Sequence, residues 1–292
     1  MTIAIFGSPY PEHFSKYIQH LIKKLENEHI KIIVEENFNT FLQNNIRFKN
    51  AVTTFNSHET LGNNVDFLFS IGGDGTLLKA VTYVRGSSIP ILGINTGRLG
   101  FISSISAGQI DDAVNDILKG KYQINERALL ELNTDKKLFK EKNFALNEVA
   151  VSKKDTSSMI RIDAFVDDEF LNTYWADGLV VSTPTGSTGY SLSCGGPIIM
   201  PGTNNIIITP NAPHNLNVRP IVIDDNSVVK LKVEDRDQLA LVSLDSRSRA
   251  FDSDTELIIK KADFKIKLIQ PQNNSFTATI RHKLMWGLDK RS

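Results

Sequence analysis

A single carboxylate, Asp74, stands among glycines in the stretch Ile71–Thr76, where it could take part in phosphate chemistry. Three glycines in four positions allow the backbone to approach a bulky ligand closely. The N–H groups freed at the start of a following helix favour an anion, most often phosphate. An aspartate carboxylate and a phosphate repel each other, so an aspartate beside phosphate needs a further role. It can bind a metal, accept a hydrogen bond from a hydroxyl, or take the proton of that hydroxyl during phosphoryl transfer. The alternative is that Asp74 only caps the helix.

The segments around Asp74 must hold it at the edge of a sheet. An apolar strand is predicted over residues 65–70, and a helix is predicted to begin near Thr76. The chain opens with a strand over 2–6, an amphipathic helix from Phe14 to Leu25 and a strand over 30–34. Because this is a β-α-β pattern, we expect a parallel sheet with helices on both faces and ligand sites at the carboxyl ends of its strands.

A second glycine-rich loop, Asn95–Phe101, follows a predicted strand over 90–94, and an amphipathic helix is predicted over 107–119. From about residue 121 the chain changes to short segments that are rich in β-branched residues and separated by turns. This spacing predicts a mainly antiparallel β domain. The strands are predicted over 123–133, 144–152, 160–166, 170–174, 178–183, 205–209, 219–223, 228–234, 239–243, 257–260 and 265–269.

The expected architecture is therefore an α/β domain followed by a mainly antiparallel β domain. We place the first domain at residues 1–120 and the second at 121–270, and the tail from about 271 to 292 could return to the first. The glycine and acid turn at Asp74 lies in the first domain.

Two polar residues, Asn147 and Glu148, interrupt the apolar strand predicted over 144–152. Since successive side chains of a strand point to opposite faces, one of the pair should face inward. An unpaired polar group there costs about 1–3 kcal/mol, so a ligand is one expected partner. A neighbouring backbone edge is the other.

The segment Asp177–Thr183 predicts a strand that ends in Pro184–Pro197, a loop dense in hydroxyls and glycines. Hydroxyl and backbone donors without basic residues suit a neutral sugar, adenine, or phosphates whose charge Mg²⁺ already meets. A flexible linker is the alternative, but the prolines and the apolar residues of the loop argue against it.

Other candidates are weaker. His214 lies in a proline-containing loop and is more often structural in such a place, and Ser243–Arg247 could either cover a ligand or form a plain hairpin with Asp245 in its turn. Cys194 could be a nucleophile, yet nothing in the sequence singles out a base to activate it.

Composition limits the class of protein. The 33 basic and 33 acidic residues give a net charge of zero, which does not support a nucleic-acid or membrane-surface role. A single cysteine excludes an internal disulfide framework. The N-terminus lacks the basic start of a signal peptide, and no uncharged apolar run reaches about 18 residues. We therefore expect a cytoplasmic protein with neither nucleic acid nor membrane as partner.

Taken together, five segments resemble the NAD kinase family: Gly72–Thr76, Asn95–Phe101, Asn147–Glu148, Asp177–Gly178 and Thr183–Tyr190. They span roughly residues 65–250, in the order that the family has them. The first is shared with diacylglycerol and sphingosine kinases and, loosely, with phosphofructokinases. The last, together with Asn147–Glu148, is far more specific.

This resemblance implies an enzyme that moves the γ-phosphoryl of ATP, with Mg²⁺ or another divalent metal, onto the 2′-hydroxyl of the adenine ribose of NAD to give NADP. It implies that Asp74 orients this hydroxyl and accepts its proton. It also implies a homo-oligomer, a dimer or a tetramer. No residue of the chain is predicted to bind a metal. The residues that it places at the nucleotides are Gly73, Gly75, Lys79, Asn147, Glu148, Trp175, Asp177, Thr188, Gly189, Tyr190, Ser191, Ser193, Ala212 and Arg247.

Within that set, the resemblance assigns Asn147, Thr188 and Tyr190 to the adenosine half, Glu148 to a ribose diol, and Asp177 with Ala212 to the nicotinamide half.

Two positions depart from the family pattern. Trp175 stands where many bacterial members have arginine, which leaves the preference for NAD over NADH open, and Arg247 stands where relatives often have an uncharged amide. The alternatives to an NAD kinase are a lipid or sugar kinase that shares the Asp74 turn, or a dinucleotide sensor without catalysis.

Overall fold

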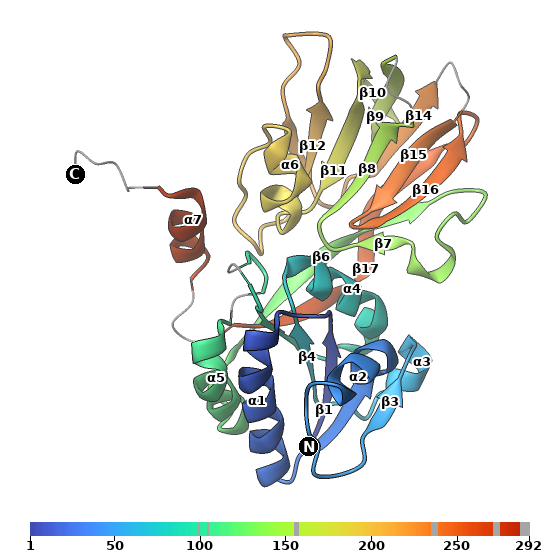
Figure 1. Cartoon of the computed structure of the whole chain (residues 1–292). Coiled ribbons are helices and arrows are strands. Elements are labelled where there is room, and N and C mark those ends of the chain that lie inside the picture. The colour runs from blue at the N-terminus through green and yellow to red at the C-terminus, as the bar shows by residue number, and fades with distance from the viewer. Residues whose placement is uncertain (98–99, 104, 155–157, 235–238, 271–274, 287–292) are drawn as a thin grey trace. The chain divides into compact units, whose positions relative to one another are not determined.

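The structure, a computed structural model, describes residues 1–97, 100–103, 105–154, 158–234, 239–270 and 275–286. The chain divides into two compact units (Figure 1). The α/β unit consists of Met1–Glu126 and Ile266–Ser292, and the β unit consists of Arg127–Lys265. Each unit carries part of the predicted site, so each is described by itself.

A parallel sheet with the strand order β17-β5-β4-β1-β2-β3 forms the centre of the α/β unit. Its strands are β1 (Thr2–Gly7), β2 (Lys31–Glu35), β3 (Thr53–Phe55), β4 (Phe67–Ile71), β5 (Ile91–Ile94) and the end of β17 (Leu257–Gln270). Its helices are α1 (Ser15–Asn27), α2 (Glu36–Gln43), α3 (His58–Leu61), α4 (Asp74–Val84), α5 (Ile110–Leu118) and α7 (Phe276–Leu284). In the part of the chain that the structure describes, no helix combines the length and the apolar character that a membrane span requires.

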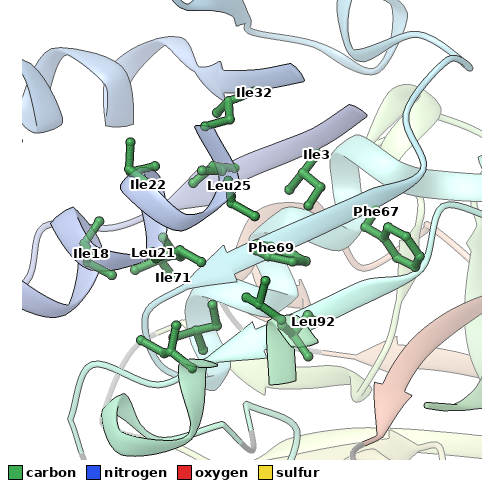
Figure 2. Close-up of a cluster of buried hydrophobic side chains, with 14 of the residues drawn as sticks. Ile3, Ile18, Leu21, Ile22, Leu25, Ile32, Phe67, Phe69, Ile71 and Leu92 are labelled. Carbon is green, nitrogen blue, oxygen red and sulfur yellow. The ribbon is translucent and has the colours of Figure 1, made fainter. Parts of the chain in front are cut away.

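Helices cover both faces of this sheet, as predicted. Ile3 and Ile5 of β1 belong to the same buried cluster as Leu21 of α1, which Figure 2 shows in detail. On the opposite face of β1, the ring of Phe6 lies 5.0 Å from the ring of Tyr83 in α4. Side chains that alternate along β1 therefore pack against α1 on one face of the sheet and against α4 on the other.

The β unit contains antiparallel strands in two layers. One layer has the order β10-β9-β14-β17 and the other the order β13-β12-β11-β8-β15-β16. Alternate residues of both layers, such as Ile162 of β9 and Val151 of β8, share one buried cluster. The strands are β6 (Gln123–Asn133), β7 (Phe144–Ala145), β8 (Glu148–Lys153), β9 (Ile160–Val166), β10 (Glu169–Ala176), β11 (Gly178–Ser182), β12 (Asn205–Asn211), β13 (Ile221–Asp224), β14 (Val229–Glu234), β15 (Leu239–Leu244) and β16 (Arg247–Asp252).

The predicted fold class, a parallel α/β part and an antiparallel β part, is confirmed, but several elements differ. The strand predicted over 144–152 is wrong, because it breaks at Leu146–Asn147 into β7 and β8. The two segments predicted over 257–260 and 265–269 form the single strand β17, and β16 was not predicted. The break matters for the site, because it places three consecutive backbone N–H groups outside the regular ladder.

Candidate active site

The turn after β4 brings Asp74 to the carboxyl end of the parallel sheet. Helix α4 begins at Asp74, and Gly73 is its N-cap residue. Within the described residues, no side chain caps this helix, so the alternative that Asp74 is only a helix cap is wrong. Gly72 has a φ of 151°, and a Cβ there would overlap Thr76, so glycine is required at that position.

Backbone N–H groups at the end of the second glycine-rich loop and directly after it hold the carboxylate of Asp74. Oδ2 accepts a hydrogen bond from the N–H of Phe101 at 2.8 Å. Oδ1 accepts from the N–H groups of Ile102 at 3.3 Å and Ser103 at 2.9 Å. The two predicted glycine loops therefore meet, although the sequence did not predict these bonds. Arg98 and Leu99 of the predicted loop lie outside the described residues.

Space for a ligand remains beside Asp74. The side chain is partly exposed and both flanking glycines, Gly73 and Gly75, are exposed. A Cβ on either glycine would meet nothing within 4 Å of the described structure. Lys79, another predicted site residue, lies about 140° around α4 from Asp74, given about 100° per residue in a helix. It is exposed but not directed to the same side of the helix.

Asp245 holds the chain at the break between β7 and β8 in the β unit. It lies in the turn between β15 and β16, as the plain-hairpin alternative predicted, with a φ of 53°. Its carboxylate accepts hydrogen bonds from the N–H groups of Leu146 at 3.0 Å, Asn147 at 2.8 Å and Glu148 at 3.3 Å. Sequence reasoning did not assign this role. The only signal was an aspartate in a turn, which is commonly an exposed residue.

Asn147 and Glu148 lie on the same side, against the expectation that they point to opposite faces. That expectation assumed a continuous strand. A Cβ on Gly189 would lie 2.9 Å from Oε2 of Glu148 and 3.3 Å from Nδ2 of Asn147, so both side chains approach this glycine. Oδ1 of Asn147 and Oε2 of Glu148 are buried and find no hydrogen-bond partner among the described residues. Buried acceptors without donors are costly, and a ligand with N–H or O–H groups would satisfy them.

Burial, together with the nearby charge of Asp245, raises the pKa of the Glu148 carboxyl to about 8, although the backbone N–H of Tyr190 acts in the opposite direction. Burial also raises the pKa of Asp245, despite the N–H bonds that it accepts. Near pH 7 Glu148 therefore carries a proton, so it can donate to a ligand as well as accept.

The protonation of Glu148 should make the free energy of unfolding of the ligand-free protein depend on pH. The pKa of Glu148 is about 8 when folded against a reference value of 4.5. Between these values the folded protein holds a proton that the unfolded chain has released, so stability falls as pH rises through this window. The difference in the free energy of unfolding between the wild-type protein and Glu148→Gln should fall by up to about 1.4 kcal/mol for each pH unit. It should become constant above about pH 8. Chemical denaturation at several pH values measures this difference. If it is the same at every pH, the prediction is contradicted.

Internal hydrogen bonds order the loop between β11 and β12. The hydroxyl of Thr183 donates to the carbonyl of Leu146 at 2.6 Å, and the N–H of Gly186 donates back to that hydroxyl at 3.0 Å. Gly186 lies so close to Asn147 that a Cβ would overlap its backbone. The loop is thus fixed against the same strand break that carries Asn147 and Glu148, and the linker alternative is wrong.

The predicted hydroxyl-bearing residues of this loop differ in what they can reach. Ser191 is fully buried, and its Oγ lies 2.9 Å from Oγ1 of Thr209. The hydroxyl of Thr188 donates to the carbonyl of Thr185 at 3.2 Å. Tyr190 is 40% exposed, and its hydroxyl accepts from Nδ2 of Asn211 at 2.8 Å. Ser193 is exposed.

The two residues predicted for the nicotinamide half, Asp177 and Ala212, lie near the start of β11, and Trp175 lies two residues before Asp177. Asp177 forms an ion pair with Lys153 at 2.7 Å. Trp175 is 52% exposed, and its carbonyl accepts from the backbone N–H of the exposed His214 at 2.8 Å. Ala212 is exposed, with a φ of 47°.

Arg247 is directed toward its own chain. Its guanidinium donates to the carbonyl groups of Lys142 and Phe144, and it lies 5.6 Å from the centre of the Phe144 ring. Burial lowers its pKa. These contacts give Arg247 a structural role within its own chain. Its contact with the nucleotide stays a prediction.

Cys194 is a poor nucleophile here. Burial raises the pKa of its thiol, and the charge of Glu148 acts in the same direction. Since the thiolate is the reactive form, both effects reduce its reactivity.

A carboxylate fixed at the end of a parallel sheet, with open glycine backbone beside it, is suited to phosphoryl transfer. Buried acceptors in the β unit are suited to a ligand rich in hydroxyl and amine groups. The fold and these groups fit the class of phosphotransferases that act on nucleotides.

Comparison with known proteins narrows this class to one family. Residues 3–122 match the ATP-NAD kinase N-terminal domain, and residues 146–271 match the ATP-NAD kinase C-terminal domain. The NAD kinase of Flavobacterium psychrophilum is 49% identical over 294 residues, and that of Cytophaga hutchinsonii is 47% identical over 293 residues; each comparison covers 100% of both chains. The chain belongs to the NAD kinase family.

Solved structures share the fold of this chain. Yeast NADH kinase complexed with NADH has a TM-score of 0.87 at 23% identity, over 99% of this chain and 89% of that one, and shows the shared fold. An NAD kinase from Archaeoglobus fulgidus in complex with ATP has a TM-score of 0.75 at 25% identity, over 98% of this chain and 99% of that one.

Proposed function

We propose that this protein transfers the γ-phosphoryl group of ATP to the 2′-hydroxyl of the adenine ribose of NAD, with Asp74 as the proton acceptor. The 2′-oxygen forms a bond to the γ-phosphorus while the bond from that phosphorus to the bridging oxygen of ADP breaks, and the hydroxyl proton passes to Asp74. A loose transition state requires the proton to leave only late, so positioning supplies much of the acceleration.

The single observation that carries the proposal is the position of Asp74, partly exposed between open glycines at the carboxyl end of the sheet. Full-length similarity to NAD kinases identifies the class of hydroxyl that it would meet.

The unpaired acceptors of Asn147 and Glu148 support binding of the adenosine part of the dinucleotide in the β unit. Adenine offers an amine and ribose offers hydroxyls, which are the donors that these buried oxygens lack. Protonated Glu148 would donate to one ribose oxygen and accept from the other hydroxyl. Tyr190, which is 40% exposed in the loop beside Glu148, supplies a flat apolar surface.

We propose that Mg²⁺ enters with ATP as part of the substrate. Among the described residues, no three His, Cys, Asp or Glu side chains gather to hold a metal ion. Mg²⁺ usually retains waters and binds substrate phosphates with one or two carboxylates, so it does not require a protein cage. A homo-oligomer and a cytoplasmic location are further parts of the proposal; they rest on the family resemblance and on the single cysteine.

An activity panel tests the proposal. Purified protein with ATP and Mg²⁺ should convert NAD to NADP, measured by an NADP-specific dehydrogenase, and NADH in place of NAD would determine the preference at Trp175. Phosphorylation of a sugar or of diacylglycerol, but not of NAD, would contradict the proposal. So would tight NAD binding in calorimetry without consumption of ATP.

A further inference from the structure

We propose that the loop segment Gly100–Ser103 is the positioning element for Asp74 and that it reserves Oδ2 of this carboxylate for the substrate hydroxyl. This inference rests on the proposed function and assigns the atom that performs the chemistry.

The hydrogen bonds of the carboxylate are unequal. An ionised carboxylate has about four acceptor sites, two on each oxygen. Oδ1 accepts from the N–H groups of both Ile102 and Ser103, so its sites are filled. Among the described residues, Oδ2 accepts only from the N–H of Phe101, which leaves one site on this oxygen. The hydroxyl proton therefore passes to Oδ2 as the new oxygen–phosphorus bond forms and ADP leaves with its bridging oxygen.

Neighbouring strand ends fix the loop. The N–H of Ile105 donates to the carbonyl of Gly93 at 3.1 Å, and the N–H of Asn95 donates to the carbonyl of Ile105 at 2.7 Å. Ser103 is fully buried, and its hydroxyl donates to the carbonyl of Gly72 at 3.2 Å. The donors that hold Asp74 are thus attached to both β4 and β5, which limits their movement.

Gly100 determines how close the loop comes to the carboxylate. A Cβ at this position would overlap Oδ1 and Cγ of Asp74. Any side chain at 100 must therefore displace either the loop or the carboxylate. Gly108, a few residues later in the same unit, would meet nothing within 4 Å of the described structure if it carried a Cβ. It is a matched control.

The first test is kinetic. We expect Gly100→Ala to lower kcat by about 10- to 100-fold, because a displacement near 1 Å at a catalytic group has effects of this size. The KM values for NAD and ATP should stay within about twofold, because Gly100 is not among the residues predicted at the nucleotides. Gly108→Ala should keep the wild-type kcat. A wild-type kcat in Gly100→Ala would overturn the inference.

The second test does not depend on activity. Gly100→Ala should lower the thermal midpoint in the wild-type background, but not in Asp74→Ala, where the overlapping atoms are absent. An equal loss in both backgrounds would overturn the inference, because the alanine would then overlap something other than Asp74. The two proposals are separable: if Asp74→Asn abolishes turnover and Gly100→Ala does not, only the loop inference fails. If the wild-type protein makes no NADP, the proposed function fails, and the unfolding test still decides whether the loop contacts Asp74 in this way.

Discussion

The variant Asp74→Asn should lose about 10²- to 10⁴-fold in kcat for NAD phosphorylation, the range expected when a general base is removed. The amide has nearly the same shape as the carboxylate but cannot accept the hydroxyl proton. Its oxygen can keep the bonds from Ile102 and Ser103, while its NH₂ group faces the N–H of Phe101. Loss of that one bond costs about 1 kcal/mol, so the variant should fold. Steady-state kinetics together with thermal unfolding measure both effects.

Asp66→Asn is the matched control for this variant. Asp66 is an exposed residue of the same unit, and its carboxylate accepts from the backbone N–H of Thr2 at 2.6 Å. The substitution therefore also weakens one carboxylate bond to the backbone, but outside the site. Asp66→Asn should keep full turnover. A wild-type rate in Asp74→Asn would remove Asp74 from the chemistry.

The second large effect is expected at Asp245, which is not itself a predicted ligand-binding residue but holds the backbone of Asn147 and Glu148. Asp245→Ala would remove the acceptor for the N–H groups of Leu146, Asn147 and Glu148. A buried donor without a partner costs about 1–3 kcal/mol, so the free energy of unfolding should fall by on the order of 3 kcal/mol or more. The KM for NAD should rise as well, because the same N–H groups fix the backbone of Asn147 and Glu148.

A graded series separates this positioning role from a general loss of charge. Asp245→Asn keeps an oxygen for the two bonds that Oδ1 accepts, from Asn147 and Glu148, and loses only the bond to Leu146. It should therefore be less destabilised than Asp245→Ala. Asp224→Ala serves as the control, since Asp224 accepts from the N–H of Asn226 in an exposed turn. Equal stability of all three variants in urea denaturation would contradict the role of Asp245.

Much of the α/β unit could be predicted from local patterns. The strand over 2–6 and the helix up to Leu25 carry regular apolar spacing, and the strand, glycine turn and helix around Asp74 form a local unit. The β-α-β pattern also predicted ligand sites at the carboxyl ends of the parallel strands, where both glycine-rich loops begin. These inferences needed only the sequence within each segment.

The bonds within the site could not be predicted in the same way, because they join residues far apart in the chain. Asp74 binds N–H groups about 27–29 residues later, and Asp245 binds N–H groups 97–99 residues earlier. Every residue except proline has a backbone N–H group, so the residue types do not indicate which of these groups bonds to a carboxylate. Apolar content suggested one continuous strand over 144–152, whereas the buried carboxylate of Asp245 stabilises a break. A tertiary hydrogen bond thus overrides the local pattern.

A structure of the protein with bound NAD and a non-hydrolysable ATP analogue tests the central claim most directly. The measured quantity is the distance from the 2′-oxygen of the adenine ribose to each oxygen of Asp74. We expect about 2.6–3.2 Å to Oδ2, with the N–H groups of Ile102 and Ser103 still bonded to Oδ1. A 2′-hydroxyl that lies away from Asp74, while this carboxylate binds only the loop backbone, would contradict it.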